Sequence, residues 1–399
     1  MTQALLTLGN GEDQVKSAVV AIDWDGHEPV AAAAGVSRAD TGAPMRVETQ
    51  FHIASVGKPM TAALIFQAVE EGKLGPKGLD ARLIDTGVLP PEICRRLHKI
   101  DGVSHGDRIT VRHLLTHTSG LRDAQIDDGD MVSEGYGGSP APNSIIGRRA
   151  QDLRLHVEAV AGGRKPDASL LTNKHWIPWD PARPDEVEAG LVNYYLNNGA
   201  MADRALFKPG EAFHYSDTAY TILGLLAERV LGTSYHRLLR SRIFDPLGMN
   251  GSYLDAHSDL APSPWVREVS DCWSGSVPMV SYGISLSNDW GGGGQVCTAD
   301  DLNRFIKGLL AGRLFRSKTT LHEMLRWSKP RGSSGQFAKV GCGIFTFASG
   351  TGLEIIGHSR AWGAKMLAVP ALGMVLSGTV NRRGAKAEWM IAIAEALAA

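Results

Sequence analysis

Segments typical of β-strands occur near both ends of this 399-residue chain, and segments with helical periodicity fill the region between them. Near the N-terminus, Ser17–Asp23 is rich in valine and isoleucine, and an Asp-Gly turn signal follows it. Pro29–Val36 can return as its antiparallel partner. Near the C-terminus, Lys365–Val369 and Met374–Thr379 flank a turn that contains proline and glycine. We therefore expect one sheet built from both ends of the chain, with a helical region inserted into it.

Apolar residues at helical spacing dominate much of that central region. After Lys58 they recur three and four positions apart, and Gly72 stands where a helix would end. The other helical stretches are Thr110–Leu115, Ala219–Leu231, Ser234–Arg242, Ala299–Leu310 and, at the end of the chain, Ala385–Ala398. Residues 123–207 differ, because they are polar and rich in glycine, proline and aspartate. Such a segment is either a surface excursion or a lid over a site.

Composition and charge exclude several classes of protein. Lys+Arg 41 against Asp+Glu 42 gives a net charge of −1, and without any basic run this argues against nucleic acid as a partner. No stretch approaches the roughly 20 apolar residues of a membrane span, and Met1–Leu8 lacks the basic residue of a signal peptide. We therefore expect a cytoplasmic protein with no membrane partner.

The cysteines at 94, 272, 297 and 342 show no CxxC spacing. This pattern favours reduced thiols and leaves one distant disulfide open.

The sharpest chemical signal is the S-x-x-K motif formed by Ser55 and Lys58 at the start of the first long helix. Residues three apart share a helix face, with Cβ atoms about 5–6 Å apart, so the hydroxyl and the amine can meet. Serine is a weak nucleophile until a neighbouring base takes its proton. Lysine can act as that base only when neutral, and burial and the positive end of a helix both favour its neutral form. The motif alone also arises by chance, so it needs support from other segments.

That support comes from a series of segments that resemble one family. Phe51–Pro59 resembles the nucleophile segment of the serine β-lactamase / penicillin-binding-protein superfamily, in particular its class C-like esterase and D-aminopeptidase branch. Further matching segments follow in order: Ile109–Leu121 (the family's "LLTHTSGL"), Phe207–Gly210, Tyr215–Asp217 and Tyr220–Gly224 ("PG…YSN…YxxLG"), Asp245–Met249 ("PLGM"), Gly292–Leu302, and Gly357–Ser359 with Gly363 and Pro370 (usually H-x-G). Together they cover about residues 15 to 382, almost the whole chain.

The resemblance implies an α+β fold of the serine β-lactamase type, an antiparallel sheet flanked by helices with an inserted mainly helical lobe. Residues 1–80 and 300–399 would form a discontinuous sheet lobe. Residues 81–299 would form the helical lobe, with the insert at about 123–207 resembling a lid over a site between the lobes. The implied function is a serine hydrolase of the carboxylesterase or amidase type that needs no cofactor. Its substrate would be an ester or amide of a small molecule or short peptide, with an esterase placed slightly ahead of a D-aminopeptidase or amidase.

Two alternatives from other classes remain at this point. One is an acyltransferase that passes the same acyl group to an alcohol or amine instead of water. The other is a non-catalytic binding protein on the same scaffold, suggested by departures from the family pattern at Asp217 and Arg360. The oligomeric state is not predicted.

The resemblance also assigns roles to individual residues. Ser55 would be the acylated nucleophile, Lys58 its base or proton partner, and Tyr215 would share the proton transfer. The oxyanion hole would use the backbone N–H groups of Ser55 and Ala361. His358 would line the site beside the nucleophile. In addition, Trp362 is a candidate for the apolar wall of a substrate pocket.

Asp217 departs from the family pattern, because the family usually has asparagine at this position. A carboxylate only accepts hydrogen bonds, so Asp217 could pair with Lys58 and favour its charged form, against the base role. Ser216-Asp217-Thr218 can also be interpreted as the S-D-N element of class A enzymes, which would make Ser216 the proton shuttle. We prefer Tyr215, because the flanking segments fit the esterase branch better.

Arg360 replaces the glycine of H-x-G. Its forked cation either binds an acidic group of the substrate or points away into the protein. A metal site is not expected, because the i, i+4 pair His113 and His117 lacks the glutamate of H-E-x-x-H.

Overall fold

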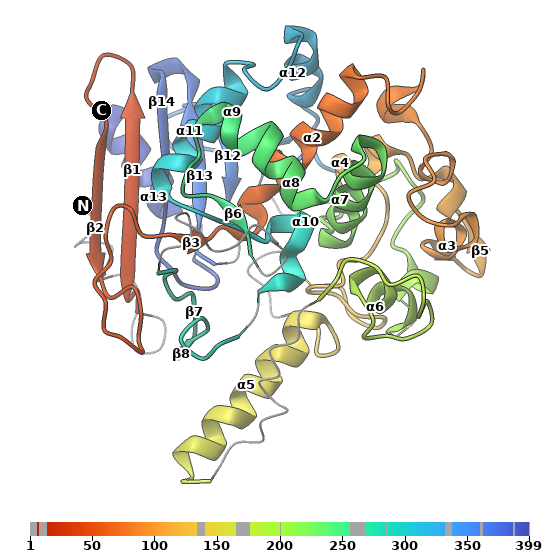
Figure 1. The fold of residues 1–399 in the computed structure, drawn as a ribbon, viewed down its shortest axis with the longest axis horizontal. Coiled ribbons are helices and arrows are strands. Elements are labelled where there is room, and N and C mark those ends of the chain that lie inside the picture. The colour runs from red at the N-terminus through yellow and green to blue at the C-terminus, as the bar shows by residue number, and fades with distance from the viewer. Residues whose placement is uncertain are drawn as a thin grey trace.

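The computed structural model describes residues 6–7, 14–133, 140–164, 176–199, 201–255, 268–284, 286–331, 337–359, 362–385 and 388–398. Its main feature is a seven-stranded antiparallel sheet in the order β10-β11-β12-β13-β14-β1-β2 (Figure 1). The strands are β1 (Ser17–Trp24), β2 (Val30–Gly35), β10 (Lys339–Val340), β11 (Phe345–Phe347), β12 (Ile355–Ser359), β13 (Lys365–Val369) and β14 (Met374–Thr379). Both ends of the chain thus contribute to one sheet, which confirms the predicted α+β class.

Strand β1 joins the two ends of the chain, because it pairs with β2 on one side and with β14 on the other. Its side chains alternate between two hydrophobic cores. Val19 and Ala21 face the core that contains α11 (Ala299–Leu310), whereas Val20 and Ile22 face the core that contains α13 (Glu388–Ala398). Both faces of the strand are therefore buried, which explains its continuous apolar sequence.

The central helix of the molecule is α2 (Lys58–Glu70). Nearly all of its side chains are buried, and it packs against α7 (Asp217–Leu231), as Figure 1 shows. The other helices are α3 (Pro91–Arg96), α4 (Val111–Leu115), α5 (Ile145–Ala161), α6 (Leu191–Asn197), α8 (Tyr235–Leu239), α9 (Asp245–Leu247), α10 (Trp290–Gly293) and α12 (Lys318–Met324). The predicted stretch Ser234–Arg242 is helical but changes character, since a π-helical turn at Arg240–Phe244 follows α8.

Among the described residues, three small sheets accompany the main one. A three-stranded sheet has the order β3-β9-β6, and its strands are β3 (Phe51–His52), β6 (Tyr253–Leu254) and β9 (Gln295–Cys297). Two hairpins pair β4 (Lys99–Ile100) with β5 (Val103–Ser104) and β7 (Trp273–Ser274) with β8 (Val277–Pro278). Strand β3 matters for function, because the chain leaves it directly toward Ser55.

In the described part of the insert at residues 123–207, two helices, α5 and α6, were not predicted from the sequence. Figure 1 shows α5 extending away from the rest of the molecule. Leu153 of α5 belongs to a small apolar cluster with Ala54 and Trp362, next to the predicted nucleophile. The lid role of this insert stays a prediction.

The four cysteines are free thiols, and all are buried. Among the residues that the structure describes, no helix combines the length and the apolar character required to cross a bilayer.

Candidate active site

Ser55 lies in a tight turn between strand β3 and helix α2. The turn is a short 3-10 helix (Ala54–Gly57), and Ala54 adopts the left-handed conformation with φ of 47°. This geometry places Ser55 at the N-terminal end of α2, with 5% of its surface exposed. Gly57 cannot carry a side chain, because a Cβ atom there would lie 1.8 Å from the Gln295 amide oxygen. The close packing therefore explains the glycine inside the S-x-x-K motif.

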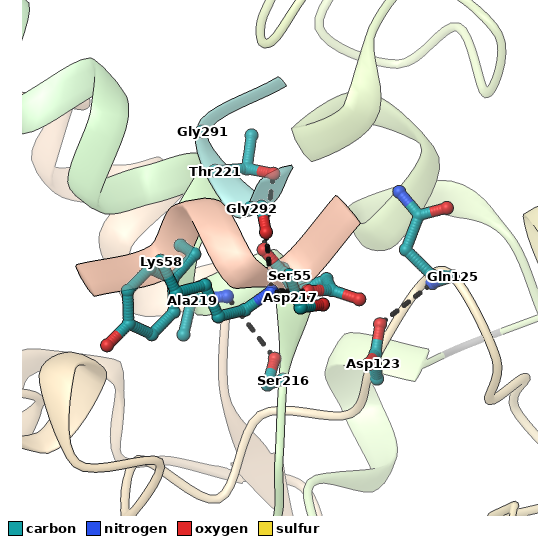
Figure 2. Close-up of polar contacts among 12 residues, drawn as sticks. Ser55, Lys58, Asp123, Gln125, Ser216, Asp217, Ala219, Thr221, Gly291 and Gly292 are labelled. Atoms are coloured by element: carbon teal, nitrogen blue, oxygen red, sulfur yellow. Dashed lines mark hydrogen bonds and ion pairs between the residues drawn. The ribbon is translucent and has the colours of Figure 1, made fainter. Parts of the chain in front are cut away.

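Lys58 is the first residue of α2 and is completely buried. Its Nζ donates a hydrogen bond to Ser55 Oγ at 3.0 Å and another to the Gly292 carbonyl oxygen at 2.7 Å. It also forms an ion pair with Asp217. Burial by itself lowers the pKa of Lys58, but Asp217 and Tyr215 outweigh it and raise the pKa above its usual value of 10.5. The structure therefore favours a charged lysine beside the serine (Figure 2).

Asp217 is the first residue of α7, which begins at a clear N-cap. Ser216 Oγ accepts a hydrogen bond from the Ala219 N–H and donates one to the Arg122 carbonyl oxygen. A carboxylate in the first turn of a helix lies at the positive end of the helix dipole. Because the Ser216 hydroxyl is used to cap the helix, the geometry favours Tyr215 over Ser216 as the proton-transfer group.

Tyr215 lies against Lys58, with the lysine Nζ 4.9 Å from the centre of its ring. The Tyr215 ring also contacts His117, which stacks on it with ring centres 4.1 Å apart. His117 also accepts a hydrogen bond from the Ser216 N–H at its Nδ1, and its carbonyl oxygen accepts one from the His214 N–H. With φ of 57°, His117 itself adopts a left-handed conformation. It thus fixes the segment that carries both Tyr215 and Asp217.

The glycine-rich helix α10 packs against the ion pair and against the turn that carries Ser55. The Gly292 carbonyl oxygen accepts the hydrogen bond from Lys58 (Figure 2). A Cβ at Gly292 would lie 3.1 Å from Asp217 Oδ1, and one at Gly293, where φ is 150°, would lie 2.0 Å from the Ala54 carbonyl oxygen. The glycines therefore allow the backbone to approach both the ion pair and the nucleophile turn.

Two further carboxyl groups lie near this ion pair, those of the buried Asp123 and the half-buried Asp289, and neither was predicted from the sequence. Asp123 accepts a hydrogen bond from the Gln125 N–H at 2.9 Å, and burial, together with Asp217, raises its pKa well above the usual value. Burial and the charge of Asp217 also raise the pKa of Asp289, to about 7. Asp123 lies in a loop and Asp289 ends a short 3-10 turn (Ser287–Asp289), and neither belongs to a recognisable motif. The site therefore concentrates carboxyl groups around a single lysine.

Of the remaining predicted residues, His358 and Trp362 lie near this centre. His358 of β12 is buried, and its ring centre lies 6.3 Å from that of Tyr215. Trp362 is buried in the apolar cluster with Ala54. Arg360 and Ala361 lie outside the described residues, so the proposed second oxyanion donor and the departure at Arg360 stay predictions. Within the described ranges, no three His, Cys, Asp or Glu side chains lie close enough to hold a metal ion.

Comparison with known proteins gives a family match over nearly the whole chain. A family model described as Beta-lactamase matches residues 3–147 and 170–399. Among curated proteins, Protein Rv1367c of Mycobacterium tuberculosis is 28% identical over 281 residues, which are 68% of this chain and 56% of that protein. Penicillin-binding protein 4* of Bacillus subtilis is 24% identical over 341 residues, which are 80% of this chain and 57% of that protein. The chain thus spans about half the length of the curated relatives it matches.

Solved structures show the same fold. A D-stereospecific amidohydrolase from Streptomyces sp. superposes with a TM-score of 0.68 at 22% identity, covering 98% of this chain and 96% of that chain. D-amino acid amidase from Ochrobactrum anthropi SV3, complexed with L-phenylalanine amide, gives a TM-score of 0.63 at 20% identity, covering 92% of this chain and 87% of that one.

Proposed function

Because the chain belongs to the Beta-lactamase family, we propose that it is a serine hydrolase that forms an acyl-enzyme on Ser55. The observation that carries this proposal is the 3.0 Å contact between Ser55 Oγ and Lys58 Nζ, at the N-terminus of a buried helix and beside Tyr215. A serine hydroxyl held this way is in position to attack a carbonyl carbon. The bond cleaved would be an ester or amide of a small molecule or short peptide.

In this mechanism Ser55 Oγ bonds to the carbonyl carbon, and the bond to the leaving alcohol or amine breaks. Lys58 donates to Ser55 Oγ, and its pairing with Asp217 favours the ammonium form, which cannot accept the serine proton. Tyr215, as a phenolate beside the Lys58 ammonium, is then the group that receives the proton, and as the phenol it passes that proton to the leaving group. Any neutral Lys58 would be a second acceptor of the serine proton. Water releases the acyl group in the second half of the reaction. The backbone N–H of Ser55, at the positive end of α2, is the proposed donor to the oxyanion.

The buried carboxyl groups favour a substrate that carries a positive charge near the scissile bond. Asp123, Asp217 and Asp289 lie around the buried Lys58, and Arg149 also attracts Asp289. The raised pKa values of Asp123 and Asp289 reflect burial and, in part, the repulsion from Asp217. A substrate ammonium group would relieve that repulsion. We therefore now place an aminoacyl ester or amide ahead of a simple ester. The fold shared with a D-amino acid amidase is compatible with this substrate class.

A panel of substrates tests the proposal. Purified protein and Ser55→Ala would be assayed with p-nitrophenyl esters, D- and L-aminoacyl amides and a chromogenic cephalosporin. We expect turnover of at least one aminoacyl ester or amide, and its loss in Ser55→Ala. Adding an alcohol or amine acceptor at fixed donor concentration separates hydrolysis from acyl transfer, because a transferase would form the transfer product instead of the free acid. Turnover that persists in Ser55→Ala would contradict the proposal.

One observation favours a second candidate, a non-catalytic binding protein. The Asp217–Lys58 ion pair opposes the role of Lys58 as a neutral base. In that case the carboxyl-rich site would bind a cationic ligand without acylation. Covalent labelling of Ser55 distinguishes the two candidates.

A further inference from the structure

One face of helix α5 in the insert is directed at the wall of the active site. Arg149, Leu153 and Val157 follow one another at four-residue spacing, so they lie on the same face of the helix. Leu153 and Val157 pack in the apolar cluster that contains Ala54, the residue before the predicted nucleophile. Although α5 extends away from the body of the molecule (Figure 1), this face thus brings Arg149 close to the site.

The Arg149 side chain is half-buried and has one polar contact. Its Nη1 donates a hydrogen bond to Asn288 Oδ1 at 3.0 Å, and it forms no ion pair within the described part of the chain. Burial lowers the pKa of Arg149, and the titratable groups that oppose this effect are Asp289, Cys272 and Asp152. Charges removed from water are normally paired directly, because their lost hydration is costly. A cation kept here on one amide contact therefore indicates a role toward its neighbours.

Asn288 connects two loops that flank the Lys58–Asp217 ion pair. Its Nδ2 donates to Gln125 Oε1 at 2.7 Å, and its carbonyl oxygen accepts a hydrogen bond from Gln125 Nε2 at 2.6 Å. The Asn288 side chain is only 3% exposed, so its Oδ1 depends on Arg149 for a hydrogen-bond donor. The next residue in the chain is Asp289. Arg149 thus fixes the segment that carries this carboxyl group.

The charge of Arg149 also acts on Asp289. Burial and Asp217 of α7 raise the pKa of Asp289 to about 7, whereas Lys58 of α2 and Arg149 of α5 both lower it. The buried Cys272 thiol is a further titratable group beside Asp289. Among these groups, Arg149 is the cation that the insert supplies, and it favours the ionised form of Asp289.

We propose that Arg149 is a positioning residue of the active site. It holds Asn288, and with it Asp289, beside the Lys58–Asp217 pair, so that the insert controls how tightly the site binds the ammonium group of a substrate. This role rests on the proposed function, in which the substrate is an aminoacyl ester or amide. Without the cation of Arg149, Asp289 would keep its proton to higher pH, and a neutral acid does not form the strong charge-assisted hydrogen bond of a carboxylate.

The test measures binding without turnover, in the full-length Ser55→Ala protein. Both enantiomers of phenylalaninamide, and their N-acetyl derivatives, which lack the ammonium group, are titrated by calorimetry at pH 6, 7 and 8. We expect at least one enantiomer to bind about tenfold more tightly than its acetyl derivative. Adding Arg149→Met should weaken its binding about tenfold at pH 6 for each unit by which the pKa of Asp289 rises, and by about twofold or less at pH 8. The ionisation of the ligand cancels, because the same ligand is compared at each pH.

Further variants separate this role from a purely structural one. Arg149→Gln keeps a donor for Asn288 without the charge and should behave like Arg149→Met, which also keeps the test decisive if the methionine variant does not fold. Arg149→Lys keeps the charge and should restore binding to within about threefold. Arg154→Met removes an exposed arginine from the same helix and should change nothing. In an Asp289→Asn background, Arg149→Met should no longer have a pH-dependent effect.

Three results would each overturn the proposal. They are equal affinity for the ammonium and acetyl ligands, a loss of binding in Arg149→Met that is the same at pH 6 and pH 8, and a pH-dependent loss that persists in the Asp289→Asn background. Failure of the hydrolase function is a separate result, because it is measured by turnover and by acylation of Ser55, and neither enters this binding experiment.

Discussion

Asp217 and Lys58 form a buried ion pair, and the same lysine donates a hydrogen bond to Ser55 Oγ. The pair joins the first residue of α2 to the first residue of α7, 159 positions later in the chain. Asp217 and Tyr215 together raise the pKa of Lys58, so the charge state of the lysine, and with it the reactivity of Ser55, depends in part on this carboxylate.

Asp217→Asn tests this dependence. Without the carboxylate, only Tyr215 opposes the effect of burial, so the pKa of Lys58 falls and neutral lysine becomes available at lower pH as a second acceptor of the serine proton beside Tyr215. We expect the rising limb of kcat/KM against pH to move to lower pH. At pH 7.5 the rate should increase about tenfold for each unit by which the lysine pKa falls. The pH profile of a p-nitrophenyl aminoacyl ester between pH 6 and 10 measures this, and a limb that stays in place or moves upward would show that Asp217 does not control Lys58.

Tyr215→Phe tests the proton-transfer role of the phenol. Removing the hydroxyl while keeping the ring stacked on His117 should reduce kcat by about 10²–10⁴, the usual contribution of general acid–base catalysis. Tyr220→Phe is the matched control, because Tyr220 lies nearby and its hydroxyl donates to the Leu115 carbonyl oxygen at 2.9 Å. That variant should lose about 1 kcal/mol of stability and keep its activity. Equal losses of kcat in both variants would refute a special role for Tyr215.

Substitutions in the glycine-rich turn should separate activity from stability. In Gly292→Ala the new Cβ would crowd the Asp217 carboxylate at 3.1 Å, so we expect a folded protein with reduced kcat. In Gly293→Ala it would lie 2.0 Å from the Ala54 carbonyl oxygen at a φ of 150°, so the backbone itself must move. We expect the second variant to lose far more stability than the first. Thermal melting and kcat, measured side by side, check this order, and a Gly293→Ala protein as stable as Gly292→Ala would contradict it.

Asp289→Asn should stabilise the protein at pH 8 and have little effect at pH 4. Burial and the charge of Asp217 raise the pKa of Asp289 to about 7 from an ordinary 3.8. Between these values the folded state keeps a proton that the unfolded chain has lost, so the free energy of unfolding falls as pH rises, and above pH 7 the full cost remains. Asparagine removes that cost, which is at most about 4 kcal/mol, because a tenfold change in proton affinity equals 1.4 kcal/mol.

Melting temperatures of Asp289→Asn and the unmodified protein at pH 4, 6 and 8 measure this effect. The control is Asp185→Asn, since the Asp185 side chain is 82% exposed. A difference in melting temperature that does not grow with pH would mean that Asp289 is not held in an unfavourable environment.

Much of the fold could be predicted from local patterns. Strands β13 and β14 have the bounds expected from their sequence, because strands buried on both faces form continuous apolar runs bounded by turn residues. Helix α7 begins at Asp217 and not at the expected Ala219, since its N-cap is Ser216. Helix α5 was missed, because the segment is polar and only a few of its residues, such as Leu153, pack against the body of the molecule.

The candidate site could be predicted only where a motif exists. Ser55, Lys58 and Tyr215 belong to segments with family signatures, and the structure brings them together. Asp123 and Asp289 belong to no such segment, and their approach to Lys58 depends on how distant loops pack. Sequence spacing carries no information on such tertiary contacts.

The central claim is that Ser55 becomes acylated, and intact-mass measurement tests it most directly. The protein and its Ser55→Ala variant would be incubated with a fluorophosphonate and, separately, with a slowly hydrolysed aminoacyl ester. We expect one adduct per chain in the unmodified protein, located on Ser55 by peptide mapping, and none in Ser55→Ala. An unmodified protein that forms no adduct with either reagent, or an adduct that persists in Ser55→Ala, would contradict the account.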